Sequence, residues 1–122
     1  MIKDNDVVAV EGFTMMGLAE EILQAIENSF LRSGHPRDLT LIHCAGGSDR
    51  THGLQHFAHE RLVKRIIGSH WGLAPLMMDF IGHNKVEAYA FPQGQLSHYF
   101  RAMAARKSGL FSQIGLHTFV DP

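Results

Sequence analysis

The sequence has few of the features that mark specialised classes of protein. Its 122 residues include a single cysteine, Cys44, which excludes an internal disulfide framework and is compatible with a reducing compartment. No apolar run approaches the roughly 18–20 residues of a membrane span, and the acidic start, Met1–Asp6, does not resemble a signal peptide. We therefore expect a soluble, cytoplasmic protein.

Charge of either sign is also scarce. Eleven basic residues stand against twelve acidic ones, which gives a net charge of −1, so nothing indicates binding to nucleic acid or to an anionic membrane. Apolar residues make up 45% of the chain and charged residues 19%, the proportions of a globular protein. The unusual counts are those of histidine (nine), methionine (six) and glycine (twelve).

Short apolar runs alternate with amphipathic segments along the chain. This alternation, without hairpin signals, predicts an α/β fold with a mainly parallel open sheet and helices on both faces. The expected strands are 7–10, 39–43, a short one that begins at Ile66, and 86–90, and the expected helices are 18–30, 54–65, 75–81 and 95–106.

In such sheets ligands bind beyond the carboxyl ends of the strands, so the loops there are the candidate site. The glycine loop Glu11–Gly17 follows the first strand, where its backbone N–H groups suit an oxyanion or a carboxylate. Gln93 lies in the turn Phe91–Gly94 after the fourth strand. There it is either a hydrogen-bond partner for a substrate or only a turn residue.

The sharpest local pattern is His43–Thr51, which resembles the phosphate loop of cysteine-dependent phosphatases. Such a loop needs a cysteine thiolate at a helix N-terminus, glycine-rich backbone around the phosphate, and an arginine fork, here Cys44 and Arg50. Only 43 residues precede Cys44, and no acid loop of the Trp-Pro-Asp type is present. The alternative is a buried cysteine before a glycine turn.

Three histidines, His52, His56 and His59, have a spacing that would place them on one face of a helix. Metal ligands can be arranged in this way, but a polar helix face is the commoner reason, and we assign no metal site.

Seven segments, in order along nearly the whole chain, resemble family I coenzyme A transferases, most closely those that act on acetate, propionate and other short-chain acyl-CoA. The family's N-terminal signature is matched by Asp4-Asn5, by Val8–Val10, by Gly12-Phe13 and by Gly17, while Glu11 replaces a glycine and Ala19 a proline. The seven segments are Gly34–Leu41, Gly53–Glu60, Leu62–Arg65, Gly68–Gly72, Lys85–Tyr89, Pro92–Gly94 and Gly115–Pro122.

The resemblance implies a three-layer α/β sandwich and transfer of CoA between carboxylic acids. In that reaction a glutamate attacks the acyl-CoA thioester to give a mixed anhydride and then a glutamyl-CoA thioester, from which the incoming carboxylate collects CoA. The family carries this glutamate in its C-terminal half, so the resemblance implies that residues 1–122 are an N-terminal portion without the nucleophile. CoA would be a substrate, with no permanently bound cofactor.

The resemblance also implies supporting roles within this chain. Gln93, beside Gly94, would contact the catalytic carboxylate or the acyl group, and Gly12, Phe13 and Gly17 would shape the floor of the acyl pocket. The chain would need the rest of the enzyme or a partner subunit, and a homo-oligomer is expected. The alternatives are the phosphatase and an inactive, truncated relative.

Overall fold

The fold, described for residues 2–121 by a computed structural model, is built on one sheet of four parallel strands in the order β1-β2-β3-β4. The parallel α/β prediction is thereby confirmed. None of the helices in this range has the length and apolarity that crossing a membrane requires. The strands are β1 (Val7–Ala9), β2 (Leu39–Ile42), β3 (Val63–Gly68) and β4 (Glu87–Ala90), and the helices are α1 (Glu20–Ser33), the 3₁₀ helix η1 (Gly53–Phe57), α2 (Pro75–Gly82) and α3 (Gln93–Ala104).

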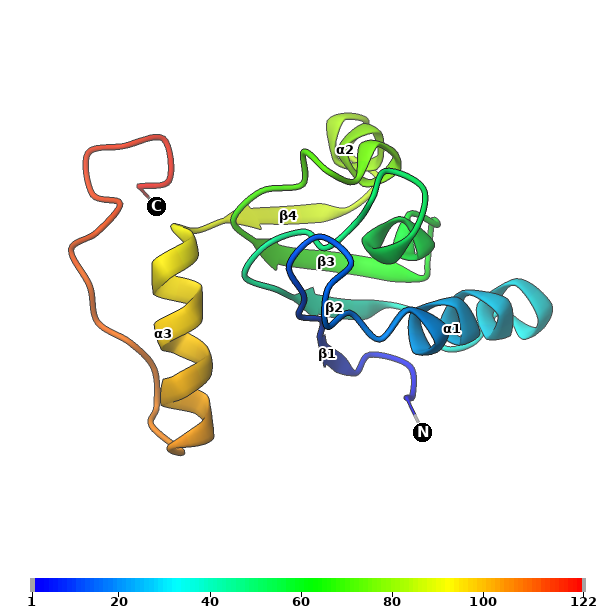
Figure 1. Cartoon of the computed structure of the whole chain (residues 1–122), viewed down its shortest axis with the longest axis horizontal. Helices are drawn as coiled ribbons and strands as arrows, with labels where there is room; N and C mark the ends of the chain where they lie inside the picture. Colours follow the sequence, from blue (N-terminus) through cyan, green and yellow to red (C-terminus); the bar gives the residue numbers. More distant parts are fainter. Residues whose placement is uncertain (1, 122) are drawn as a thin grey trace.

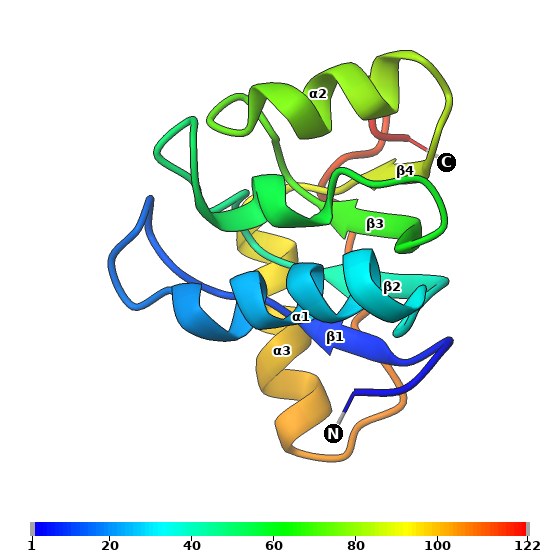
Figure 2. The same ribbon diagram turned by 90° about the vertical axis from the view of Figure 1, so that its right-hand side faces the viewer.

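Helices lie on both sides of the sheet, as the sequence predicted. The connecting helices α1, η1 and α2 lie together on one side (Figure 1). Turning the molecule by 90° shows α1 and η1 in front of the sheet and α2 above β4, with α3 and the C-terminal segment behind the sheet (Figure 2). We call the side of α1, η1 and α2 the first face and the side of α3 the second face.

Helix α1 shows how local sequence determines an element and its packing. Leu23 and Ile26 are three residues apart and are both buried in the core. Two glutamates occupy the first turn, where the helix dipole favours negative charge. The helix ends at Gly34, whose φ of 74° is the left-handed conformation that glycine adopts readily, and its N–H donates to the carbonyl of Phe30. The helix thus ends three residues later than the predicted range of 18–30.

The prediction of one helix over residues 54–65 is wrong. The segment forms only the short helix η1, and strand β3 begins at Val63. Arg61, between them, has a φ of 73°, which a helix cannot accommodate. Apolar side chains of this segment are buried in the core all the same. Leu54 and Phe57 reach the core from the 3₁₀ helix, and Val63 reaches it from the strand.

The core of the first face reaches the carboxyl ends of the strands at His43. This side chain is fully buried, and its Nε2 accepts a hydrogen bond from the Trp71 indole N–H at 2.8 Å. Burial lowers the pKa of His43 to about 4, so the ring is neutral. Gly68 makes room for the ring, because a Cβ there would lie 2.1 Å from Cε1 of His43.

Replacement of Gly68 by alanine is expected to destabilise the fold by about 2 kcal/mol or more, because the buried His43 ring cannot move aside without disturbing the core. The measurement is urea unfolding followed by circular dichroism. The matched control is Gly72→Ala, since a Cβ at Gly72 meets no atom within 4 Å. Equal stability of the two variants would contradict this reading of the core.

Candidate functional site

A hollow of about 620 Å³ lies beyond the carboxyl ends of the strands, and we call it the cleft. Three parts of the chain that are distant in sequence meet there: the loop after β1, the loop after β2 and the first turns of α3. The location is the one that parallel α/β sheets use for ligands. The residues that line the cleft are Glu11, Gly12, Phe13, Cys44, Ala45, Gln93, Gly94 and Ser97.

The fold brings most of the candidate residues into this cleft. Gly12, Phe13, Gln93 and Gly94 all line it, although their chemical roles remain predictions. Gly17 does not line the cleft. It follows the tight turn in which Phe13 pairs with Met16, and its φ is 74°.

Ser97 is a lining residue that the sequence reading missed. It follows Gln93 by four residues, and on a helix this spacing places two side chains on the same face. This spacing from Gln93 is the feature of the sequence that could have identified Ser97 as a lining residue.

Glu11 determines the electrostatic character of the cleft wall. Its carboxylate oxygen Oε1 accepts a hydrogen bond from the backbone N–H of Cys44 at 2.6 Å. Burial, followed by the hydrogen bond and the charge of Glu11, raises the pKa of the Cys44 thiol to about 11. Cys44 is therefore a neutral thiol near pH 7.

The phosphatase alternative requires the opposite arrangement. Its nucleophile is a thiolate, and its loop N–H groups must be free to bind phosphate. Here the thiol pKa is raised, a carboxylate occupies the N–H of Cys44, and Arg50 does not line the cleft. The structure does not support a phosphatase that uses Cys44 and Arg50.

The opposite wall of the cleft provides hydrogen-bond donors. Gln93 and Gly94 are the first two residues of α3, where backbone N–H groups have no partner within the helix and the helix dipole attracts negative charge. The side-chain amide of Gln93 and the hydroxyl of Ser97 add further donors. The wall can receive a carboxyl or carbonyl oxygen, while Glu11 faces it as a fixed negative charge.

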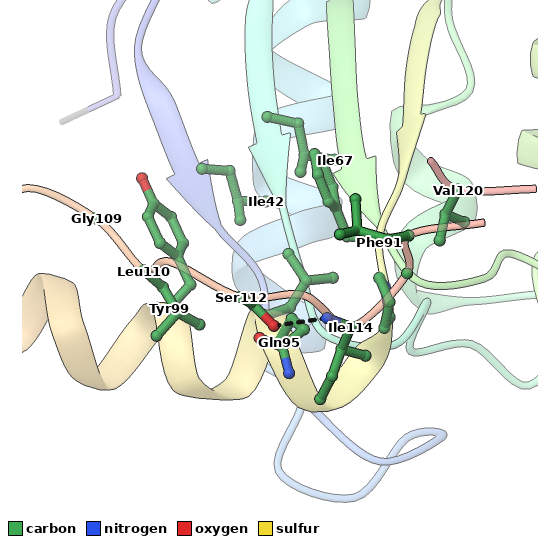
Figure 3. Close-up of a pocket in the computed structure, with 14 residues that line it drawn as sticks. Ile42, Ile67, Phe91, Gln95, Tyr99, Gly109, Leu110, Ser112, Ile114 and Val120 are labelled. Carbon is green, nitrogen blue, oxygen red and sulfur yellow. Dashed lines mark hydrogen bonds between the residues drawn. The ribbon is translucent and has the colours of Figure 1, made fainter. Parts of the chain in front are cut away.

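A second hollow, of about 510 Å³, lies on the other side of α3 (Figure 3). Apolar side chains of the sheet, including Ile42 and Ile67, face Leu96 and Tyr99 of α3 and the segment 109–120. We call it the apolar cavity. Its lining is mostly apolar, and the polar side chains in it are those of Gln95, Tyr99 and Ser112.

The three histidines do not share one face. His52 donates to Asp49 in its own loop, whereas His56 and His59 both reach Glu27 of α1. His56 has its Nδ1 2.5 Å from Glu27 and its Nε2 2.7 Å from Glu20, and this placement between two carboxylates favours the doubly protonated, positively charged ring. Residues 2–121 contain no group of three or more His, Cys, Asp or Glu side chains placed to hold a metal ion.

The fold and cleft define a class: a parallel α/β protein with a cleft at the carboxyl ends of the strands, where such folds bind their ligands. The model of the coenzyme A transferase family matches residues 1–122, so the chain belongs to that family. Its position in the relatives corresponds to an N-terminal part of a family I enzyme.

Two curated relatives illustrate the similarity. The acetate CoA-transferase YdiF of Escherichia coli O157:H7 is 39% identical over 105 residues, which are 85% of this chain and 20% of the relative. The caffeate CoA-transferase of Acetobacterium woodii is 36% identical over 123 residues, 100% of this chain and 24% of the relative. The chain therefore spans between a fifth and a quarter of the relatives' length.

Solved structures agree with the fold. The acyl-CoA transferase YdiF of E. coli O157:H7 in its thioester complex with CoA is 36% identical and superposes with a TM-score of 0.89. The match covers 99% of this chain and 25% of that one. The apoenzyme gives a TM-score of 0.90, with 24% of its chain covered.

Alkylation of Cys44 by iodoacetamide is expected to be slow at pH 8 and to rise only as the pH approaches 11, because the thiolate is the reactive form. Glu11→Gln should shift the rate profile to lower pH by removing the neighbouring charge. Glu21→Gln, a change in an exposed glutamate of α1, should leave it unaltered. A wild-type midpoint below the ordinary value of 9.0 would reopen the phosphatase interpretation.

The ion pairs of His56 predict a pH-dependent stability. Burial opposes the charged ring, but hydrogen bonds to Glu20 and Glu27 outweigh burial and raise the pKa of His56 above 6.5. A raised pKa adds stability that is complete below pH 6.5 and is lost as pH rises through the folded-state value.

The free energy of unfolding, measured by urea titration at several pH values above 6.5, should therefore fall in the wild type. In His56→Gln the fall should be much smaller. His98→Gln, on the exposed surface of α3, should retain the wild-type dependence. A His56→Gln profile parallel to that of the wild type would contradict the doubly protonated ring.

Proposed function

We propose that this chain is the N-terminal segment of a CoA-transferase that moves CoA between a short-chain acyl-CoA and a carboxylate such as acetate. The observation that carries the proposal is the family match over the whole chain. The cleft at the carboxyl ends of the strands supports it, because the first residues of α3 present hydrogen-bond donors there. CoA acts as a substrate. The lone free cysteine supports a cytoplasmic location.

In the proposed reaction the nucleophile is a glutamate of the remaining polypeptide. Its carboxylate attacks the thioester carbonyl, CoA leaves as a thiolate, and a mixed anhydride forms. The thiolate then attacks the glutamyl carbonyl and releases the first carboxylate, which leaves a glutamyl-CoA thioester. The incoming carboxylate takes CoA by the reverse of these steps.

This chain supplies the surroundings of the reacting carboxyl groups. The Gln93 amide and the first N–H groups of α3 are placed to donate to an oxygen that gains negative charge. Gly12 and Phe13 form the adjoining wall. Glu11, on the same side, disfavours a second negative charge on the acyl group, which suits short monocarboxylic acids.

The exposed surface supports the need for a partner polypeptide. In the C-terminal segment Phe111 is 100% exposed and Phe119 is 96% exposed. Ile114 and Leu116 of the same segment are exposed as well, and a folded monomer rarely leaves so many apolar side chains of one segment in water. Because nearly the whole chain superposes on the larger YdiF enzymes, we infer that the rest of a transferase covers this segment. A homo-oligomer of the completed enzyme belongs to the same proposal.

The test uses a chimera that joins this chain to YdiF without the aligned segment. The chain alone is expected to show no exchange of CoA between acetyl-CoA and labelled propionate, whereas the chimera exchanges CoA. Gln93→Ala in the chimera should lower kcat/KM by about tenfold to a hundredfold through loss of a donor to the developing charge.

Gln95→Ala is the matched control, because Gln95 is on the same helix but faces the apolar cavity. Exchange by the isolated 122 residues would contradict the need for a partner. An inactive chimera that folds would favour the truncated, inactive relative. Equal losses in the two glutamine variants would remove Gln93 from the proposed site.

A further inference from the structure

We propose that Glu11 selects the acyl group that the cleft accepts, and that it favours short acyl groups with a terminal ammonium, such as that of β-alanine. The proposal rests on the proposed function, because it takes the cleft to be the place where a carboxyl group exchanges CoA. It goes beyond that function by naming a substrate class and the residue that recognises it.

Glu11 is the charged side chain of the cleft. The other residues of this chain that line it are glycines, apolar residues, a cysteine, a glutamine and a serine. The ion pairs formed within residues 2–121 involve other carboxylates, and none of them brings a basic side chain within 4.0 Å of Glu11. One wall of the cleft therefore carries a negative charge for which this chain provides no counter-charge.

The carboxylate of Glu11 is held in place and still has capacity to bind a ligand. Its Oε1 accepts the hydrogen bond from the backbone N–H of Cys44 at 2.6 Å, which fixes the side chain against the loop after β2. An ionised carboxylate has about four acceptor positions, so the N–H and the thiol of Cys44 leave positions open towards the cleft. The group that best fills them is a cation with N–H donors.

The charge of this wall is a departure of this chain from its family. In the family signature that the sequence resembles, a glycine stands at the position of Glu11. A glycine would give the wall neither a charge nor a side-chain acceptor. The substitution therefore changes which ligands the wall can bind while the glycine at the next position, Gly12, is retained.

The two walls of the cleft together complement a zwitterion. The start of α3 offers the Gln93 amide, the first backbone N–H groups of the helix and the Ser97 hydroxyl, which suit a carboxyl group. Glu11 lines the other side of the same hollow. When the carboxyl group of a short acid lies at α3, its far end is directed to Glu11. An ammonium at that end is attracted, a methyl group gains no charge interaction, and a second carboxylate is repelled.

The ammonium keeps its charge throughout the reaction, whereas the carboxylate loses its charge on becoming an anhydride or a thioester. The attraction to Glu11 therefore persists at every step. In the overall exchange, acetyl-CoA and β-alanine give acetate and β-alanyl-CoA. The acetyl C–S bond breaks, a β-alanyl C–S bond forms, and acetate gains the oxygen that β-alanine loses, by way of the enzyme's glutamate. No proton or further reactant is consumed.

The first test uses the chimera with β-alanine and butyrate, two acids of equal length, in competition for CoA from acetyl-CoA. Mass spectrometry of the two products gives the ratio of their kcat/KM values. Glu11→Gln keeps the shape of the side chain and an acceptor for the N–H of Cys44, but removes the charge. It should lower the ratio of β-alanine to butyrate by about fivefold, the effect of one partly exposed charge pair. The matched control is Glu21→Gln in the exposed first turn of α1, which should leave the ratio unaltered.

Salt and a third acid separate recognition of charge from a change in structure. Sodium chloride at about 0.5 M should lower the ratio in the unsubstituted chimera through screening, and should have little effect in Glu11→Gln. The acid 3-hydroxypropionate has the length of β-alanine with a hydroxyl in place of the ammonium. The unsubstituted chimera should prefer β-alanine to it, because a charged donor bonds more strongly to a carboxylate.

A second test needs no transferase activity, because both walls belong to this chain. In ¹H–¹⁵N NMR spectra of the 122 residues at pH 7, Gly94 reports on the α3 wall and the N–H of Cys44 reports on Glu11. Titration with β-alanine should shift both signals, whereas butyrate should shift mainly that of Gly94. In Glu11→Gln the response of Cys44 to β-alanine should be lost.

Three outcomes overturn the proposal. The first is an unchanged ratio in Glu11→Gln, the result expected if a basic group of the remaining polypeptide neutralises Glu11. The second is equal use of β-alanine and 3-hydroxypropionate, and the third is an equal response of Cys44 to β-alanine and butyrate. Exchange of CoA with propionate would still support the proposed function in each case. A chimera that folds and exchanges CoA with none of the acids contradicts the proposed function, and the NMR titration then decides whether Glu11 recognises the ammonium.

Discussion

The common direction of the four strands is the constraint on which the rest of the molecule depends. Because every strand is parallel to its neighbours, all the strand-to-helix loops lie at one end of the sheet. The loops after β1 and β2 meet the start of α3 there, although some eighty residues separate Glu11 from Gln93. The cleft is thus a consequence of topology, and its chemistry follows from the few side chains that the loops present.

Glu11 shows how one side chain decides the chemistry of such a loop. The run from His43 to Thr51 has the residue order of a phosphate loop, yet the Glu11 carboxylate binds the backbone N–H of Cys44 and raises the thiol pKa. A glutamate 33 positions earlier in the sequence therefore removes both the nucleophile and an anion-binding group. The same carboxylate leaves a cleft in which the opposite wall, at the start of α3, holds the donors.

Much of the fold could be predicted from the sequence, because periodicity in a strand or helix is local. Strands 7–9, 39–42 and 87–90 and helices α1, α2 and α3 lie within a few residues of their predicted positions. The error at 54–65 has a physical cause: buried apolar residues three and four apart occur both on a helix and along a 3₁₀ turn that leads into a strand. The prediction that His52, His56 and His59 share one helix face is wrong for the same reason, because that helix does not form.

The sequence by itself determined the parallel α/β class, the family, and the glycine and glutamine residues near the strand ends. Those properties depend on local patterns and on motifs that are contiguous in the chain. Only the tertiary structure decided that Glu11 bonds to Cys44 and that His56 is held between two glutamates. The hydrogen bonds of Glu11 and His56 join residues about thirty positions apart. Their energies depend on burial and distance, which the order of residues does not specify.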